Sequence, residues 1–477
     1  MSTKVRWVAL LGVVVLTAGA AGCNDSADPV ATTPATAVAI STPSTSMTLP
    51  APQGTPILID TDMAADGIMS MLYLLEHPDL DVLAITVSGT GLVHCEEGVE
   101  QALGLLALVG ETGIPVACGP EDPLEGINTF PGSWRAVADE GYGLELPPGG
   151  QPSDLDAPGL LVSVIGASPE PVVIHADGPN TNLAAAFRAE PSLIDNISMV
   201  YVMGGAFETG GNAIKNTDAE WNIWVDPVAA DEVLRSGVPV TLLPLDATNQ
   251  VPLNVFHLQA LQAHQSTPAA DVVVTMLTGL DSLAAGFLYF WDPLNAAILV
   301  DETYAEYESR SVAIVLDDDR SIAGAVVVDG SGSPIRVVTD VDVSRFESEY
   351  LSAIAGEDVG PIVIDTDWTG TFDGTSWEFD LPESLASGSY TLQFANRAPG
   401  PAVLVFGWLV DDATLEDLDA WDSLEQPPFL ELGPTLFAEG RSETVTTVEL
   451  EGPQSYVVVG LDIDGNEVTT ISVVEVS

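Results

Sequence analysis

The sequence predicts an open α/β domain, whose mostly parallel sheet has helices on both faces, followed by a C-terminal all-β domain that resembles a sandwich. Two observations lead to this fold class. From Thr55 to about Gly356, short apolar runs rich in β-branched residues alternate with helix-like runs. After Glu357 the apolar runs are short and alternating, with Gly, Pro, Asn and Asp between them. We therefore expect one domain over residues 55–356 and a second over residues 360–477.

The strand-like runs of the first domain are almost continuously apolar, as is typical of strands that are buried on both faces. They cover residues 82–87, 171–175, 198–202 and 238–243. The helix-like runs cover residues 68–77, 96–109, 182–189 and 227–236. Strands that alternate with helices in this way indicate βαβ units, and therefore a parallel sheet.

The second domain has the short strand-like runs of an all-β fold. They cover residues 376–379, 390–394, 444–450, 456–459 and 471–476, and a helical turn is expected around residues 415–421. The run Pro361–Trp368 repeats the apolar and acidic pattern of Pro56–Met63. Because turn residues follow the second copy, we interpret it as a coincidental strand end.

The N-terminus predicts export. Lys4 and Arg6 precede an apolar core at 8–18 that is too short to span a bilayer, so residues 1–23 predict a signal peptide. Small residues lead to Cys23 as in a bacterial lipobox, and we expect a lipidated Cys23 to anchor the exported protein to the membrane. Ordinary secretion with an incidental Cys23 is the alternative. Residues 24–54, rich in Ala, Thr, Ser and Pro, predict a flexible tether.

The composition excludes some classes of partner. The chain has 70 acidic and 12 basic residues, a formal net charge of -58, and 46% hydrophobic residues. Nucleic acid is not an expected partner, because binding phosphates requires basic patches. Besides Cys23, the chain contains Cys95 and Cys118. Outside the cytoplasm these two could form a disulfide, and buried free thiols are the alternative.

Three carboxylates follow the first strand-like run within seven residues: Asp60, Asp62 and Asp66. In open α/β sheets, ligands bind beyond the carboxyl ends of the strands. The three acids would raise one another's pKa values unless a cation lay among them, and no Lys or Arg is near in sequence. Since all the donors are oxygens, Ca²⁺ or Mg²⁺ fits better than Zn²⁺. A solvated acidic turn is the alternative.

A second polar motif follows the strand that ends at His175. Gly178–Asn182 opens a helix, with Thr181 or Asn182 near its cap. This turn is expected at the same edge of the sheet as the acids, where the backbone carbonyl of Asp177 could bind a metal. Strand-to-helix turns favour Gly, Pro and Asn in any case. We interpret His175 as a structural residue at the strand end.

Two later motifs carry further polar side chains. Glu220 and Asn222 are two residues apart, so in an extended segment they would share a side and suit a polyhydroxyl ligand such as a sugar. Loop polarity, followed by a helix capped at Asp226, is the alternative. Asp292 precedes a proline, and capping of a helix explains it without a function.

Together and in this order, the motifs resemble the inosine-uridine-preferring nucleoside hydrolase family. The resemblance covers roughly residues 55–356. The family's acidic opening matches Asp60-Thr61-Asp62 and Asp66. The remaining matches are 178–182, Met203-Gly204-Gly205, Asn212, Glu220, Asn222, Asp246-Ala247-Thr248, Asp292-Pro293 and Phe346.

The resemblance implies that a Ca²⁺-bound water hydrolyses the N-glycosidic bond of a nucleoside or a related ribosyl compound. Asp62 would be general base and metal ligand. The other implied ligands are Asp66, Asp292 and the carbonyl of Asp177. The residues implied to contact substrate are Asp66, Asn212, Glu220, Asn222 and Trp291. A homo-oligomer is compatible with this hypothesis, although no motif specifies one.

Three positions depart from the family pattern. Gly67 occupies the place of a second Asp that is a major Ca²⁺ ligand, and Trp291 occupies that of a His which helps the leaving base depart. Gly89-Thr90 replaces a Gly-Asn pair. Gly67 and Trp291 support a rival hypothesis, a catalytically weakened protein that binds a ribosyl ligand or serves as a surface scaffold on the same fold. A structural role carried by the β domain is a third hypothesis.

Overall fold

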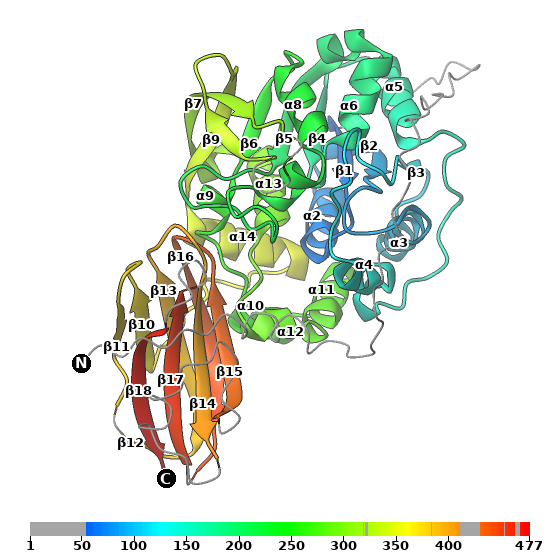
Figure 1. Ribbon diagram of the computed structural model, residues 1–477. Coiled ribbons are helices and arrows are strands. Elements are labelled where there is room, and N and C mark those ends of the chain that lie inside the picture. Colours follow the sequence, from blue (N-terminus) through cyan, green and yellow to red (C-terminus); the bar gives the residue numbers. More distant parts are fainter. Residues whose placement is uncertain are drawn as a thin grey trace, which may run out of the picture.

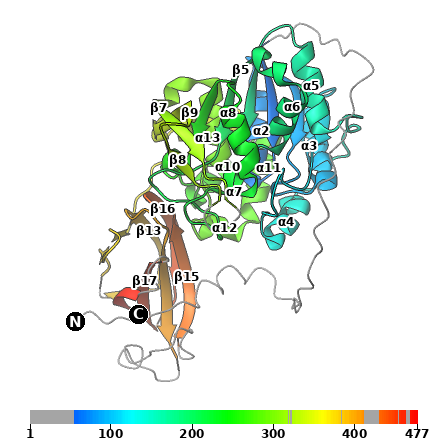
Figure 2. The same ribbon diagram turned by 45° about the horizontal axis from the view of Figure 1, so that its top comes forward.

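The computed structural model describes residues 54–477, except residues 318, 320–322, 383, 411–429, 453 and 463–467. It confirms the predicted fold class, because a nine-stranded, mostly parallel sheet with helices is followed by two smaller β-sheets (Figures 1 and 2). No helix among the described residues is long and apolar enough to cross a membrane. The predicted signal peptide, the tether and the helical turn at 415–421 lie outside the described residues.

The large sheet has the strand order β3-β2-β1-β4-β5-β6-β9-β7-β8. Neighbours from β3 to β9 are parallel, whereas β7 pairs antiparallel with β9 and with β8. The strands are β1 (Thr55–Thr61), β2 (Leu80–Val87), β3 (Val116–Cys118), β4 (Val172–Ala176), β5 (Ile197–Met203), β6 (Val240–Leu243), β7 (Ala305–Ile314), β8 (Val326–Val328) and β9 (Ser333–Val341). The strand order reverses at β1, between β2 and β4, which is where open α/β sheets form a binding crevice.

Helices cover both faces of this sheet. One hydrophobic core packs the sheet against α2 (Ala65–Glu76), α3 (Cys95–Val109), α11 (Pro268–Thr278), α13 (Trp291–Val300) and α14 (Val343–Ala355). A second core packs the other face against α5 (Ala157–Ala167), α6 (Thr181–Ala189) and α8 (Pro227–Arg235). The remaining α-helices described are α4 (Gly132–Asp139), α7 (Trp221–Val225), α9 (Leu245–Thr248), α10 (Val255–Ala263) and α12 (Asp281–Ala284).

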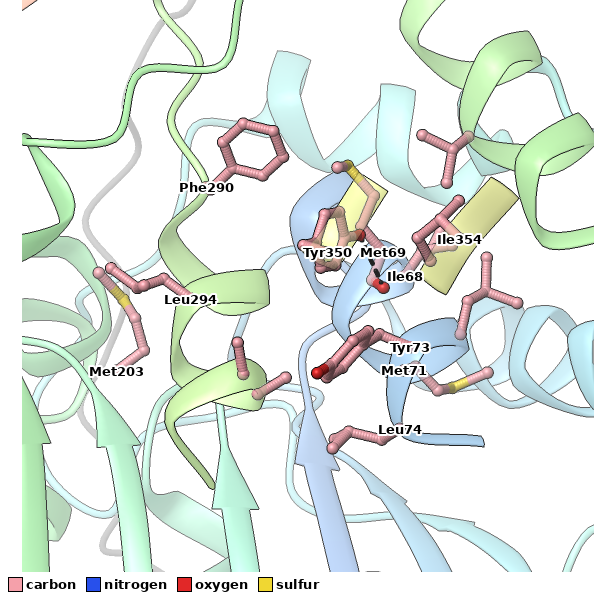
Figure 3. Close-up of a cluster of buried hydrophobic side chains, with 14 of the residues drawn as sticks. Ile68, Met69, Met71, Tyr73, Leu74, Met203, Phe290, Leu294, Tyr350 and Ile354 are labelled. Carbon is pink, nitrogen blue, oxygen red and sulfur yellow. Dashed lines mark hydrogen bonds between the residues drawn. The ribbon is translucent and has the colours of Figure 1, made fainter. Parts of the chain in front are cut away.

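The first core holds together the helices that carry the polar motifs. Figure 3 shows Ile68 and Met69 of α2 near Tyr350 of α14, and Leu294 of α13 beside Met203 in the same core. The Tyr350 hydroxyl donates a hydrogen bond to the Met69 carbonyl at 3.1 Å. These side chains are fully or almost fully buried, so the first turns of α2 and α13 are held close together by apolar packing.

The C-terminal domain is a sandwich of a four-stranded and a five-stranded sheet, with orders β11-β10-β13-β16 and β12-β18-β17-β14-β15. Its core contains large aromatic side chains, among them Trp368, Phe394 and Phe406. The strands are β10 (Trp368–Phe372), β11 (Trp377–Phe379), β12 (Ser384–Leu385), β13 (Gly388–Asn396), β14 (Ala402–Leu409), β15 (Leu430–Ala438), β16 (Ser442–Leu450), β17 (Gln454–Asp462) and β18 (Val468–Val476).

The strand end expected at Pro361–Trp368 is wrong, because residues 361–367 form no strand and β10 begins at Trp368. This segment links α14 to the sandwich, and within it only Asp367 bonds to a described strand, through its N–H to the Thr391 carbonyl of β13 at 2.8 Å. Val363 is 80% exposed, so an apolar run alone does not make a strand without a neighbour to pair with.

The turn between β15 and β16 joins the two domains. The Gly440 carbonyl accepts hydrogen bonds from Thr209 Oγ1 and, at 3.0 Å, from Asn249 Nδ2. Farther along β16, Thr446 Oγ1 donates to the Ala284 carbonyl at 2.9 Å. The sandwich therefore contacts the segments of the α/β domain that precede α7 and α13.

Candidate active site

Asp62 lies directly after β1, at the edge where the strand order reverses, and is 2% exposed. Its Oδ1 accepts the Ala64 N–H at 3.2 Å and its Oδ2 accepts the Leu92 N–H at 3.0 Å. A Cβ atom on Gly91 would lie 2.2 Å from Asp62 Cβ, and one on Gly178 would lie 2.9 Å from it. The carboxylate is therefore clamped between two backbone segments that approach closely because both carry glycine.

The residue after Asp62 has an unusual backbone conformation. Met63 has φ +55°, a left-handed value that is uncommon for a residue with a side chain, and it is fully buried. Its N–H donates to Thr61 Oγ1 at 3.1 Å and its carbonyl accepts the Tyr142 hydroxyl at 3.3 Å. Backbone strain of this kind is concentrated at functional sites, and here it lies between Asp62 and Asp66.

Four carboxylates from four elements meet around this point. Asp62 follows β1, Asp66 lies in the first turn of α2, Asp177 follows β4, and Asp292 lies in the first turn of α13. Burial raises the pKa of Asp66 to about 6, with the Asp177 charge adding to it. Burial, and then the neighbouring acids, raise the pKa of Asp62 and of Asp292 well above the usual range. The four carboxyl groups therefore resist being ionised together, and a cation among them would favour their charged forms.

These residues fit a hard cation. The Asp66 and Asp292 carboxyl groups hydrogen-bond to each other, which requires a proton on one of them unless a cation lies between them. Asp177 Oδ1 and Asp292 Oδ2 are buried without a hydrogen-bond partner among the described residues. Oxygen donors of this kind suit Ca²⁺. No three His, Cys, Asp or Glu side chains of the described chain form a ready-made metal shell, so these carboxylates would have to turn to surround an ion.

Asp60 belongs to the frame beneath this cluster. Its Oδ1 accepts hydrogen bonds from Thr86 Oγ1 at 2.7 Å and from Asn182 Nδ2 at 2.8 Å. Burial raises the pKa of Asp60 to about 7. The helix α6 begins at Thr181, with Asn180 as its cap, so Asn182 lies within the helix and connects it to β1.

The predicted sugar-binding side chains lie beside the carboxylates, but not in the expected conformation. Residues 221–225 form the helix α7, so Glu220 and Asn222 do not share a side of an extended segment, and that part of the prediction is wrong. The Glu220 carboxylate caps α7 by accepting the N–H groups of Asn222 and Ile223, and it also accepts that of Gly205. A ribose contact of Glu220 stays a prediction.

Asn222 contacts the backbone carbonyl of Asp177, which the sequence analysis named as a candidate metal ligand. Its Nδ2 donates to the Asp177 carbonyl at 3.2 Å and to the Met203 carbonyl at 3.4 Å. Asn212 Oδ1 accepts the Trp221 N–H at 3.2 Å. The amide groups of Asn212 and Asn222 therefore come from the loop and helix that follow β5, and that of Asn222 contacts Asp177, which follows β4.

Asp292 is not a helix cap, which corrects the alternative interpretation. The cap of α13 is Phe290, which makes no side-chain capping hydrogen bond, and Asp292 is 2% exposed inside the first turn. Trp291 is partly buried, and its ring lies 5.4 Å from the Tyr289 ring. The Trp291 Nε1–H is buried and has no partner among the described residues.

Sequence reasoning missed a buried polar chain behind Asp177. Asn295 Nδ2 donates to the Tyr201 carbonyl and lies 3.2 Å from His175 Nδ1, while His175 Nε2 lies 3.1 Å from Asp177 Oδ2. Ser70 Oγ lies 2.9 Å from the same Oδ2 atom. Ser70 and Asn295 belong to apolar helices, and their contacts with Asp177 and His175 span more than 100 residues, so no local pattern could have indicated them.

Cys95 and Cys118, left open by the sequence, form a disulfide with their Cα atoms 5.5 Å apart. It ties the start of α3 to the end of β3. Gly89, in the loop after β2, lies against it, because a Cβ there would be 2.7 Å from Cys95 Sγ. The disulfide thus braces the loops that border Asp62.

An open α/β sheet with buried acids and amides at its switch point is the architecture of the nucleoside hydrolases, a class of enzymes. The chain belongs to the inosine-uridine preferring nucleoside hydrolase family, whose sequence pattern matches residues 57–348. A pyrimidine-specific ribonucleoside hydrolase RihA of Escherichia coli O127:H6 is 34% identical over 224 residues, which are 46% of this chain and 70% of that protein.

Solved structures agree with this assignment. The purine-preferring ribonucleoside hydrolase from Gardnerella vaginalis is 26% identical, with a TM-score of 0.57, and the match covers 63% of this chain and 98% of that one. An inosine-uridine preferring nucleoside hydrolase from Bacillus anthracis shares the fold at 23% identity, with a TM-score of 0.56 over 63% of this chain and 99% of that one.

Proposed function

We propose that the protein hydrolyses the N-glycosidic bond of a ribonucleoside or a related ribosyl compound with the help of one Ca²⁺ ion. The observation that carries this proposal is the position of Asp62. It is a buried carboxylate at the switch point of a nucleoside hydrolase fold, and Asp66, Asp177 and Asp292 surround it. When bound, Ca²⁺ would orient the ribose hydroxyl groups and lower the pKa of a water molecule.

The residues of this chain would then divide the work. Asp62 accepts the proton of the water that attacks the anomeric carbon, while the bond from that carbon to the base nitrogen breaks and its electrons leave with the base. Asp66, beside Asp62, stabilises the positive charge that develops on the ribose, as carboxylates do in glycoside hydrolysis. Asn212, Glu220 and Asn222 orient the sugar. Trp291, which has no acidic proton to give, would stack on the base rather than protonate it.

The direct test is to incubate the purified protein with a panel of purine and pyrimidine nucleosides and to measure free base and ribose. We expect release with Ca²⁺ and loss of release after removal of metal with a chelator, restored by Ca²⁺. Full activity in excess chelator would exclude the Ca²⁺-dependent mechanism.

The second candidate function is that of a ribosyl-binding protein with little or no catalysis. Two observations favour it: Gly67 offers no oxygen ligand, and no His precedes Asp292. Calorimetric binding of a nucleoside without product after long incubation would support this function. Release of base at rates typical of enzymes would exclude it.

We further propose that the protein is exported and held at the membrane by a lipid on Cys23. The apolar segment before Cys23 supports this location, and so does the disulfide, since disulfides persist in oxidising compartments. Metabolic labelling with a radioactive fatty acid tests it. We expect label on the wild-type protein and none on Cys23→Ala. Equal labelling of both would refute the anchor, and export without label would indicate ordinary secretion.

A further inference from the structure

The start of α2 lacks a side chain beside the acid cluster. A Cβ atom on Gly67 would lie 2.9 Å from Thr61 Oγ1 and 3.5 Å from both Asp177 Oδ2 and Asp292 Oδ2. Gly67 is buried within a regular helix, so its glycine is not required by a left-handed backbone. The space next to this position is instead approached by two carboxylates from other elements.

The Asp177 carboxylate is held by one oxygen and free at the other. Oδ2 is in hydrogen-bond contact with Ser70 Oγ at 2.9 Å and His175 Nε2 at 3.1 Å. Oδ1 is buried and has no hydrogen-bond partner among the described residues, in a residue that is 2% exposed. A carboxylate fixed in this way can offer its second oxygen to a cation without losing its anchoring contacts.

The hydrogen-bond chain behind Asp177 fixes the orientation of the His175 ring. The Asn295 amide donates to the Tyr201 carbonyl and, because an amide nitrogen can only donate, His175 Nδ1 must accept its other hydrogen. The imidazole proton is therefore on Nε2, which faces the Asp177 carboxylate and Ser70 Oγ. The ring thus orients the Asp177 carboxylate through Oδ2, while Oδ1 stays without a hydrogen-bond partner among the described residues and is open to a cation.

We propose that the side chain of Asp177 is the anionic metal ligand that Gly67 cannot provide, so that the carboxylate has moved from the start of α2 to the end of β4, where His175 and Ser70 hold it. This inference rests on the proposed function for the identity of the ion. It differs from the expectation that only the backbone carbonyl of Asp177 binds the metal. It also accounts for Gly67, because an Asp at both positions would place two carboxylates against each other.

The experiment measures Ca²⁺ affinity of the purified full chain by isothermal titration calorimetry and by displacement of luminescent Tb³⁺, neither of which depends on turnover. Asp177→Asn keeps the backbone carbonyl and the size of the side chain but removes its charge. We expect Ca²⁺ affinity to fall about 10- to 100-fold. Asp156→Asn, at the cap of α5, removes one charge elsewhere and should leave the affinity within about twofold.

A compensating pair keeps the inference testable if Asp177→Asn folds poorly. Gly67→Asp combined with Asp177→Thr restores one carboxylate to the same space, and we expect it to recover Ca²⁺ affinity to within about tenfold of wild type. Gly67→Asp alone adds a like charge beside Asp177, so it should bind Ca²⁺ no more tightly than the double variant. Recovery in the double variant supports the inference.

The outcomes separate this inference from the proposed function. Wild-type affinity in Asp177→Asn, or a wild-type protein that binds no Ca²⁺, overturns the inference. If nucleosides are hydrolysed in a Ca²⁺-dependent way while Asp177→Asn binds Ca²⁺ normally, the proposed function stands and the inference fails. If Ca²⁺ binding depends on Asp177 but no nucleoside is hydrolysed, the inference stands and the proposed function fails.

Discussion

The Tyr289 hydroxyl group lies 2.7 Å from the Ser442 hydroxyl group and joins the segment that leads into Asp292 to the β-sandwich. Tyr289 is fully buried, and its hydroxyl oxygen also accepts the Glu439 N–H at 3.0 Å. On the other side, the Tyr289 ring contacts Trp291, next to the acid cluster. The side chain of Tyr289 therefore connects the sandwich to the candidate active site.

Tyr289→Phe is expected to lower the free energy of unfolding by about 1–3 kcal/mol, because it leaves the buried Glu439 N–H without an acceptor. The ring and its contact with Trp291 stay, so Ca²⁺ affinity should not change. Chemical denaturation and calorimetry measure the two quantities. Tyr390→Phe, which removes a hydroxyl on the exposed side of the sandwich, is the control and should cost less. Equal stability of the Tyr289→Phe variant and wild type would show that this contact does not stabilise the folded protein.

The buried carboxyl group of Glu439 should make the stability of the protein depend on pH. Burial raises its pKa from 4.5 to about 8 in the folded protein. Below pH 4.5 the carboxyl group is protonated in both the folded and unfolded states, so it has no effect on stability there. Between 4.5 and about 8 the unfolded state loses the proton first, so the free energy of unfolding falls as pH rises through this window.

The measurement compares denaturant unfolding of wild type and Glu439→Gln at pH 5, 7 and 9. The Gln side chain does not ionise. The free energy of unfolding of Glu439→Gln should therefore increase relative to that of wild type as pH rises. Glu443→Gln, at a partly exposed ion pair with Arg397, is the matched control. If the difference in free energy of unfolding between the two proteins did not change with pH, burial would not raise the pKa of Glu439.

The fold was predictable because the signals are local. Apolar runs that alternate with helix-like runs predicted β2, β4, β5 and β6 to within a few residues. The acid-rich turn after β1 pointed to Asp62 and Asp66. By contrast, the segment Pro361–Trp368 has the same local pattern as β1, but only its last residue, Trp368, pairs with a strand. A run of apolar residues gives a segment a preference for the strand conformation. Whether it forms a strand depends on whether another strand lies beside it in the folded protein.

The site was predictable only in part, for the same reason. From the sequence, Asp292 could be explained as a helix cap. In the structure α13 begins at Trp291, one residue before Asp292, so Asp292 lies inside the first turn and interacts with the neighbouring acids. The support of Asp177 by His175 and Ser70 joins β4 to α2 across a tertiary contact, and nothing in either local sequence marks it. Residues that act through distant partners are revealed by the structure alone.

Asp62→Asn is expected to reduce nucleoside hydrolysis at least about 100-fold, because the amide cannot accept the proton of the attacking water. The shape of the side chain is kept, so the melting temperature should fall little or rise, since burial already disfavours the charged form of Asp62. Asp79→Asn, exposed after α2, is the control and should retain full activity. Release of free base at the wild-type rate by Asp62→Asn would remove it from the mechanism.

Gly91→Ala tests whether the position of Asp62 depends on the close approach of glycine. The added methyl carbon would lie 2.2 Å from Asp62 Cβ and 2.6 Å from Asp62 Oδ2, so the loop or the carboxylate must move. We expect a loss of about 1–3 kcal/mol of stability from overpacking. A displacement of about 1 Å in the carboxylate is enough to lower activity about 100-fold.

The matched control for Gly91→Ala is Gly166→Ala, in α5. A Cβ atom there meets nothing within 4 Å, and the helical backbone favours Ala over Gly by about 0.5–1 kcal/mol. That variant should be as stable as wild type or more so, with unchanged activity. Thermal unfolding and the release of free base are measured on both variants. The comparison shows whether the position of Asp62 depends on glycine at position 91. If Gly91→Ala behaved like Gly166→Ala, the loop that carries Gly91 would have to be free to retreat from Asp62, and the clamp around this carboxylate would not be part of the site.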